Sequence, residues 1–222
     1  MRISRAVAVL MIGLMFAGVA CSRQVAGSAQ PDPNKAPLTV TKDGYGIAAG
    51  FDNAPVKIEI YTEPQCNHCA DLQHDFGDQL AYYIAVGQLQ ATYRPMTFMD
   101  DKDDGYSAQV SNALFLATDG ATGTQFQRFV EQLWANQRPG GKPPTKDELH
   151  EFATKARMSE DVAKKISDGG SAVNVKDMDD ANFGYLYDID NENMGTPTVF
   201  DLKKSEKVDI YDNDWLNKLM QS

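Results

Sequence analysis

The chain has 222 residues, 42% of them hydrophobic, which is enough for one sizeable globular domain. Its formal net charge of −10 gives an acidic surface that would repel nucleic acid. No internal period of about 20 to 50 residues is present, which excludes a repeat protein.

The first twenty residues predict a secretory signal peptide. Arg2 and Arg5 precede an uncharged run of 15 residues over 6–20, which is shorter than the roughly 20 residues that span a bilayer. Cleavage after Ala20 would remove both arginines and leave a net charge of −12. We therefore expect an exported protein.

Cys21 accounts for an odd number of cysteines. An exported protein with three cysteines has one left over after pairing, and residues 18–21, Gly-Val-Ala-Cys, resemble the lipobox of bacterial lipoproteins. They depart from it at Gly18, where such boxes usually carry Leu. The resemblance implies a lipid on Cys21 that anchors the protein at the outer face of the cytoplasmic membrane or in the periplasm; secretion with a free Cys21 thiol is the alternative. Residues 21–37, rich in Ser, Gly, Gln, Ala and Pro, predict a flexible tether to a domain over 38–222.

The domain opens with a predicted strand, helix and strand. A short edge strand at 38–41 and a glycine-punctuated loop at 44–51 come first. The apolar run 56–61 then predicts a strand, apolar spacing over 70–85 predicts a one-faced helix, and 89–93 predicts a second strand. We expect the two longer strands to be parallel, because a helix connects them.

A helical block at about 104–190 follows, and we interpret it as an insertion. The expected helices are 106–117, 126–134 with Thr124 as N-cap, one starting at a Thr145–Glu148 capping box, one capped by Ser159 and closed by Gly169-Gly170, and a weaker one over 171–187. Strand patterns return at 198–200 and 208–211, joined by a polar turn, and a last helix carries Trp215 and Leu219. The order is therefore βαβ, a helical block, then ββα.

Cys66 and Cys69 lie where the first long strand gives way to a helix. Free backbone N–H groups and the positive end of the helix dipole can stabilise a thiolate there, and the thiolate is the reactive form. A helix terminus contributes at most about 2 kcal/mol, so a strongly acidic Cys66 needs the residues between the cysteines. His68 is expected to supply a partial positive charge and an N–H donor. A dithiol whose reduced form is stabilised in this way is an oxidant.

The chain resembles DsbA-type thioredoxin-fold thiol oxidoreductases over roughly residues 47–220. The resemblance is carried by Cys66-x-x-Cys69 after a strand, a helical insertion, and Gly195-Thr196-Pro197-Thr198 before a late strand. It implies an α/β thioredoxin fold in which a βαβ half and a ββα half share a mixed central sheet, with an inserted helical subdomain. It also implies a cis Pro197 whose loop lies beside the disulfide.

The same resemblance implies roles for individual residues. Cys66 would be the nucleophile and Cys69 the buried resolving thiol, while Thr196 and Pro197 would offer backbone to an extended substrate. Asn67 is placed with the substrate-binding residues and departs from the Pro that is common at its position.

Glu63, three residues before Cys66, matches an acidic position that is frequent among DsbA-like proteins. It is our candidate for proton handling; an exposed loop carboxylate is the alternative. The acid that thioredoxin relatives often carry six residues before the first cysteine is replaced here by Ile60. Glu59, one residue away, should point to the opposite face of the sheet.

The leading hypothesis is a dithiol oxidase that introduces disulfides into exported proteins. It would use no cofactor beyond the Cys66–Cys69 disulfide and act as a monomer on unfolded or partly folded proteins with thiols. The resemblance implies a membrane reoxidant of the DsbB or vitamin K epoxide reductase type. A reductase or isomerase of exported disulfides and a non-catalytic binding lipoprotein are the alternatives. No metal is expected: a zinc site lacks a second cysteine pair, and the acidic run 100–104 lacks the spacing of a calcium site, which favours a solvated loop.

Overall fold

The computed structural model describes residues 35–222. The predicted signal peptide, Cys21 and most of the predicted tether lie outside the described residues. At the end of the tether prediction, the carbonyl of Ala36 accepts a hydrogen bond from the Gly123 N–H at 2.8 Å, and that of Pro37 accepts one from Gly50 at 2.9 Å. Contacts with the domain therefore begin before residue 38.

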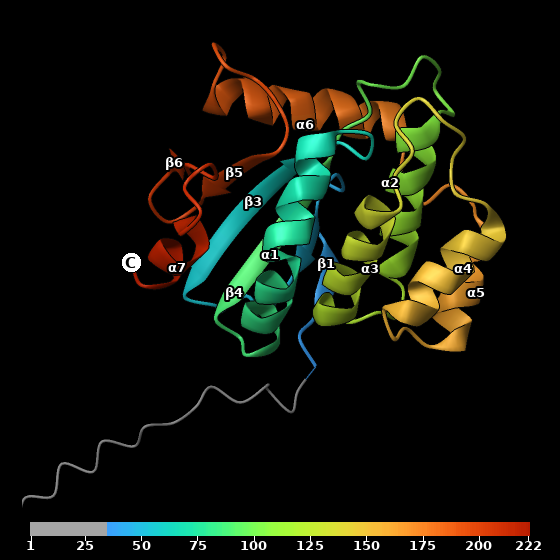
Figure 1. Cartoon of the computed structure of the whole chain (residues 1–222), viewed down its shortest axis with the longest axis horizontal. Helices are drawn as coiled ribbons and strands as arrows, with labels where there is room; N and C mark the ends of the chain where they lie inside the picture. The colour runs from blue at the N-terminus through green and yellow to red at the C-terminus, as the bar shows by residue number, and fades with distance from the viewer. Residues whose placement is uncertain (1–34) are drawn as a thin grey trace, which may run out of the picture.

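A six-stranded mixed sheet forms the centre of the described chain (Figure 1). Its strands are β1 (Leu38–Val40), β2 (Ile47–Ala49), β3 (Val56–Thr62), β4 (Leu89–Pro95), β5 (Thr198–Asp201) and β6 (Glu206–Lys207). They lie in the order β1-β2-β4-β3-β5-β6. β3 and β4 are parallel, as expected for a βαβ unit, and the other neighbours are antiparallel.

Seven helices pack around this sheet in the described residues. They are α1 (Asn67–Ala85), α2 (Tyr106–Ala117), α3 (Gly123–Ala135), α4 (Lys146–Lys155), α5 (Glu160–Asp168), α6 (Val175–Ile189) and α7 (Trp215–Met220). Helices α2 to α5 are grouped beside α1, as Figure 1 shows, and form most of the helical block expected at about 104–190. The last helix of that block, α6, packs against the sheet itself, through Leu186 on Tyr61 and Asn182 on Pro95. The α/β thioredoxin fold with an inserted helical subdomain is confirmed.

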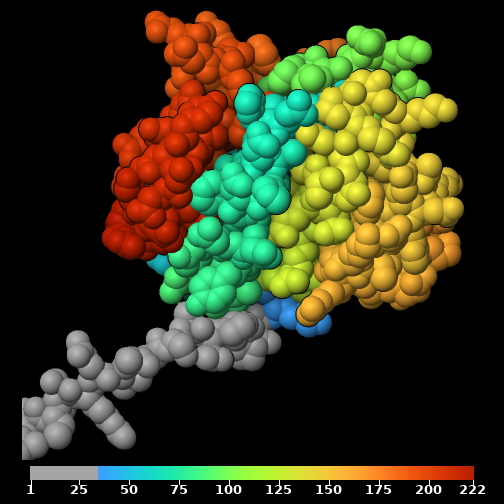
Figure 2. Space-filling view, viewed as in Figure 1, coloured from blue at the N-terminus to red at the C-terminus, as the bar shows by residue number. Residues whose placement is uncertain are grey.

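The two faces of the sheet carry separate apolar clusters. Ile58 and Ile60 of β3 belong to the main core with Leu80 of α1, whereas Tyr61 packs with Leu186 of α6. Alternate residues of a strand point to opposite faces, so α1 and α6 cover opposite faces of β3. In the view of Figure 2, α1 lies at the surface between the C-terminal segment and α3.

Several helix ends follow their sequence signals. The Thr145–Glu148 capping box forms, and Ser159 caps α5. Helix α1 begins at Asn67, three residues before the expected Ala70. The prediction of Thr124 as the N-cap of α3 is wrong, because Thr122 and Gln125 make a reciprocal capping box two residues earlier.

Two strand predictions need correction at their boundaries. Residues 47–49, expected to be loop, form β2 between β1 and β4. Hydrogen bonds on both sides hold a short, alanine-rich segment that has little strand propensity of its own. β4 also continues past the expected end at Tyr93, since Pro95 still pairs with Thr62.

The expected strand at 208–211 is not formed. The strand is only the two residues of β6, and the chain beyond it runs through turns toward α7. The apolar side chains of Val208 and Ile210 are partly buried and pack against the main core. Their spacing therefore signals burial, and the last backbone hydrogen bond to β5 is the one from the Val208 N–H to Val199 at 2.8 Å.

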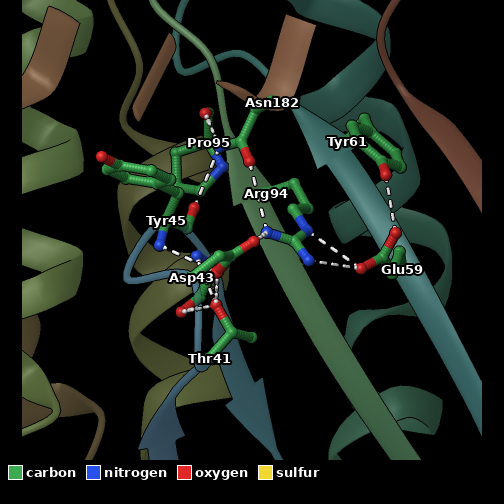
Figure 3. A network of polar contacts seen from close by, with 9 residues as sticks. Thr41, Asp43, Tyr45, Glu59, Tyr61, Arg94, Pro95 and Asn182 are labelled. Carbon is green, nitrogen blue, oxygen red and sulfur yellow. Dashed lines mark hydrogen bonds and ion pairs between the residues drawn. The ribbon is translucent and has the colours of Figure 1, made fainter. Parts of the chain in front are cut away.

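A buried ionic cluster joins the sheet to α6 (Figure 3). Arg94 of β4 is 8% exposed and donates to Glu59 at 2.7 and 2.9 Å and to Asp43 at 2.7 Å. The Tyr61 hydroxyl donates to the other oxygen of Glu59 at 2.6 Å. Glu59 thus lies on the α6 face, as its position in the strand predicted.

Candidate active site

Cys66 is the N-cap residue of α1. Its backbone is extended, with φ −75° and ψ 119°, and its carbonyl accepts the first helical hydrogen bonds, from Cys69 at 3.1 Å and Ala70 at 3.2 Å. The sulfur lies at the N-terminus of the helix, where the backbone N–H groups of His68 and Cys69 donate to it. The strand β3 ends four residues earlier, at Thr62, so a short turn places Cys66 between the end of the strand and the start of α1.

The loop before β5 lies against Cys66. The Cys66 thiol donates to the Thr196 carbonyl at 3.1 Å, although 130 positions separate the two residues. The Thr196–Pro197 peptide bond is cis, as the resemblance implied. The structure thus brings together Cys66, Thr196 and Pro197, which come from opposite ends of the domain.

Both cysteines are free thiols, and their environments differ. A hydrogen bond from the Cys69 thiol is the main cause that lowers the pKa of Cys66 to about 5; burial opposes it, and the Thr196 hydroxyl and the backbone N–H groups of Cys69 and His68 add to it. Cys69 is fully buried, and burial together with the hydrogen bond and charge of Cys66 raises its pKa. One sulfur is thus prepared as a thiolate and the other as a thiol.

Glu63 is fully buried beside the dithiol. Its carboxylate accepts from the Gln65 N–H at 2.6 Å and from the Ser107 hydroxyl, and burial raises its pKa to about 7. Its backbone N–H donates to the Cys69 sulfur. The alternative of an exposed loop carboxylate is therefore wrong, and the carboxyl can gain or lose a proton near neutral pH.

The side chains between the cysteines point away from them. The expected positive charge from His68 needs correction: its side chain is 72% exposed, with Nδ1 3.5 Å from Asp71, and His68 acts on the Cys66 thiolate through its backbone N–H. The exposed Asn67 accepts from Gln137 of the insertion at 3.2 Å. The dipeptide is therefore available to a partner at the surface.

A groove runs past the Pro197 loop. One hollow of about 380 Å³ is lined by residues 195–198 and 207–211, and a second of about 200 Å³ lies between Pro197 and His68. Ile210 and Tyr211 line both, and Tyr211 is 82% exposed. An extended peptide placed here would lie along the Pro197 loop, whose Thr196 carbonyl contacts Cys66.

Three site residues were missed by the sequence analysis: Gln65, Asp100 and Ser107. Asp100 is the first residue of the run expected to be a solvated loop, yet it accepts hydrogen bonds from the N–H groups of Ser107 and Ala108. The one signal in the sequence was a serine on the apolar side of a predicted helix. Their contacts span 35 or more positions to Gln65, which no local pattern encodes.

Two features are absent from the described part of the chain. Over residues 35–222, no three His, Cys, Asp or Glu side chains are grouped so that they could hold a metal ion. In the same residues, no helix combines the length and apolar character needed to cross a membrane.

Comparisons with known proteins agree with this geometry. A family model described as thioredoxin matches residues 42–200. The thiol-disulfide oxidoreductase MdbA of Corynebacterium diphtheriae has a TM-score of 0.67 at 23% identity, covering 85% of this chain and 97% of its own, and MdbA of Corynebacterium matruchotii has 0.67 at 21%, covering 82% and 92%. Reduced DsbA of Mycobacterium tuberculosis has 0.61 at 17%, covering 80% and 92%. A search of curated proteins found no match. The structural likeness shows a DsbA-like thioredoxin fold.

Proposed function

The chain belongs to the thioredoxin family, and from this premise we propose that it is an extracytoplasmic thiol:disulfide oxidoreductase that acts mainly as a dithiol oxidase on exported proteins. The observation that carries the proposal is the divergence of the two thiols, with the pKa of Cys66 lowered to about 5 and that of Cys69 raised. Stabilising the Cys66 thiolate stabilises the reduced form, so the oxidised form passes its disulfide on.

The reaction begins from the Cys66–Cys69 disulfide. A client thiolate attacks the Cys66 sulfur, the bond between the two cysteines breaks, and Cys69 leaves as a thiolate that takes up a proton, for which Glu63 is the proposed donor. A second client thiolate then attacks the client sulfur of the mixed disulfide and releases Cys66 as a thiolate. The client loses two electrons and gains a disulfide, and Cys66 and Cys69 are reduced.

The groove beside the Pro197 loop is the proposed binding site for the client. Backbone groups at Thr196 and Pro197, with Asn67 and His68 on the other side of Cys66, would hold an extended segment of an unfolded or partly folded client. Return to the oxidised form needs an electron acceptor, and a membrane reoxidant of the DsbB or vitamin K epoxide reductase type fits the proposal. A lipid on Cys21 would keep the domain at the membrane surface where that partner lies.

The redox potential tests the direction of the reaction. The purified domain is equilibrated with glutathione buffers, and the Cys66 thiolate is titrated by its absorbance at about 240 nm. We expect a potential near that of DsbA, about 150 mV above thioredoxin, which is about 7 kcal/mol for a two-electron couple. A potential near the thioredoxin value would make the protein a reductase.

A single-transfer assay tests whether the Cys66–Cys69 disulfide passes to a client. Free thiols of a reduced, unfolded client are counted after addition of the oxidised protein, with Cys66→Ser as the matched control. We expect stoichiometric loss of client thiols with the wild type and none with the variant. No loss with the wild type would favour a binding lipoprotein whose disulfide is static.

A further inference from the structure

A chain of buried polar groups connects the dithiol with the helical insertion. Resting on the proposed function, we propose that Ser107 of α2 is a positioning residue that sets the protonation of Glu63 and, through it, proton transfer to and from Cys69. The insertion would thereby contribute to the chemistry as well as to the client surface.

The Glu63 carboxylate has two neutral donors and no cation among the described contacts. One oxygen accepts from the Gln65 N–H at 2.6 Å, and the other accepts from the Ser107 hydroxyl. Glu63 and Ser107 are fully buried, and Gln65 is 4% exposed. In this environment each donor has a large influence on whether the carboxyl is ionised, because water cannot replace it.

The direction of the Ser107 hydroxyl is fixed by its neighbours. The Gly140 N–H donates to Gln65 Oε1 at 2.8 Å, which turns the amide nitrogen of Gln65 toward Asp100 at 2.9 Å and Ser107 Oγ at 3.2 Å. A hydroxyl has a single hydrogen to donate. Since Ser107 Oγ accepts from Gln65, its hydrogen is left for Glu63.

Asp100 holds the serine in place. Its two oxygens accept from the backbone N–H groups of Ser107 at 2.9 Å and Ala108 at 2.8 Å, so it closes the first turn of α2. Gly105 is required at the N-cap, because a Cβ there would collide with the Asp100 carboxylate. The start of α2 is thus built around the group that orients Ser107.

The charged and titratable groups around Glu63 oppose its ionisation. Burial is the largest cause that raises its pKa to about 7, and the Asp100 carboxylate and the Cys66 thiolate, from the segment before α2 and from α1, raise it further. Ser107 is the strongest influence in the other direction, followed by the Gln65 N–H. The Glu63 charge also raises the pKa of Tyr106, and the backbone N–H of Glu63 donates to the Cys69 sulfur. The Ser107 hydroxyl is therefore the contact that most favours the ionised carboxylate against burial.

Ser107→Ala tests the proposal, and Ser111→Ala is a matched control. Ser111 lies one turn further along α2, is also fully buried, and its hydroxyl has no hydrogen-bond partner among the described residues. The titration of Glu63 is followed by the infrared band of its protonated carboxyl, identified with Glu63→Gln, in the reduced protein. We expect Ser107→Ala to move the midpoint upward by about one pH unit, about tenfold in the ionisation constant, and Ser111→Ala to leave it unchanged.

Exchange kinetics provide the second readout. The pH profile of disulfide exchange should move by the same amount in Ser107→Ala, and Ser107→Thr, which keeps a hydroxyl, should restore the wild-type profile. In a Glu63→Gln background, Ser107→Ala should leave the profile unchanged. A midpoint in Ser107→Ala equal to that of Ser111→Ala, or a shift of the profile that persists without Glu63, would overturn the proposal. The infrared titration does not require turnover, so an inactive protein with the expected shift would contradict the proposed function alone.

Discussion

Glu59, a largely buried carboxylate in the middle of β3, and Glu63, a fully buried one directly after the strand, have opposite surroundings. Glu59 receives two hydrogen bonds from the Arg94 guanidinium and one from the Tyr61 hydroxyl. Glu63 directly follows the last residue of β3, and its carboxylate accepts hydrogen bonds only from neutral donors. One charge is compensated by a cation, and the other is not.

The compensated cluster is a structural junction. Arg94 also pairs with Asp43; burial opposes the ionisation of Asp43, but hydrogen bonds from Thr41 and Arg94 lower its pKa to about 2. Asn182 of α6 donates to the carbonyls of Tyr45 at 3.0 Å and Pro95 at 2.7 Å (Figure 3). These contacts join the β1–β2 turn, β4 and α6. A buried carboxylate without a cation, as at Glu63, can instead change its charge at neutral pH.

Cys66→Ser should have the largest effect and should leave the compensated cluster untouched. Loss of the nucleophilic sulfur removes the mixed disulfide, so exchange should fall by on the order of 10³-fold or more. Urea denaturation and the exchange rate are measured together. Residual exchange carried by Cys69 would mean that the buried thiol is reached by clients, against its complete burial.

Arg94→Met should disrupt the ionic cluster around Glu59 and lower the stability of the fold without changing the reactivity of Cys66. It leaves the largely buried Glu59 and the partly exposed Asp43 without their cation, which should cost about 3 kcal/mol of folding free energy, the lower end of the range for a broken buried pair. Urea denaturation of the oxidised protein measures the loss. The pH midpoint of Cys66 alkylation should stay at the wild-type value, and a shift of that midpoint would show that the two regions are coupled across β3.

Glu63→Gln should make the protein less sensitive to pH. The folded state raises the pKa of Glu63 from 4.5 to about 7 and binds the proton more tightly than the unfolded state does. Its contribution to stability is therefore complete below pH 4.5 and is lost as the pH rises through 7, by about 3 kcal/mol.

The measurement is the difference in unfolding free energy between Glu63→Gln and the wild type. This difference should grow by about 3 kcal/mol in favour of the variant between pH 4.5 and 8. Glu59→Gln is the control and should destabilise the protein, since Arg94 loses its partner. A difference that does not change with pH would mean that folding leaves the pKa of Glu63 at its unfolded value.

The residues of the dithiol site could be predicted from the sequence, whereas the partners of Glu59 and Glu63 could not. Cys66, Cys69 and Glu63 stand within one short stretch whose chemistry follows from a helix start, and the capping signals at Thr145 and Ser159 are equally local. The partners that decide the state of Glu63 and Glu59 are brought by the fold. Ser107 lies 44 positions from Glu63, and Arg94 lies 35 from Glu59.

The strand errors have the same physical origin. β2 forms because two neighbours offer hydrogen bonds to a segment with little strand propensity of its own, and the pairing with β5 ends at the Val208 N–H although the alternation over 208–211 is that of a strand. In both places tertiary contacts override the local pattern. The cis Thr196–Pro197 bond was expected through the family resemblance, since a proline in sequence alone is cis in only about 5–6% of cases.

Arg138→Met should have the smallest effect and tests whether burial, and not pairing alone, makes Arg94 structural. Arg138 donates to both oxygens of Glu148 at 3.0 and 2.9 Å, a geometry at least as good as that of Arg94 with Glu59. The two side chains are 43% and 34% exposed, against 10% and 13% for Arg94 and Glu59. Water can solvate the carboxylate that remains, so we expect a loss of only about 0.2–1 kcal/mol, measured by urea denaturation beside Arg94→Met. Equal losses in the two variants would mean that the number of hydrogen bonds governs stability and would remove the distinction drawn between Glu59, whose charge has a cation, and Glu63, whose charge has none.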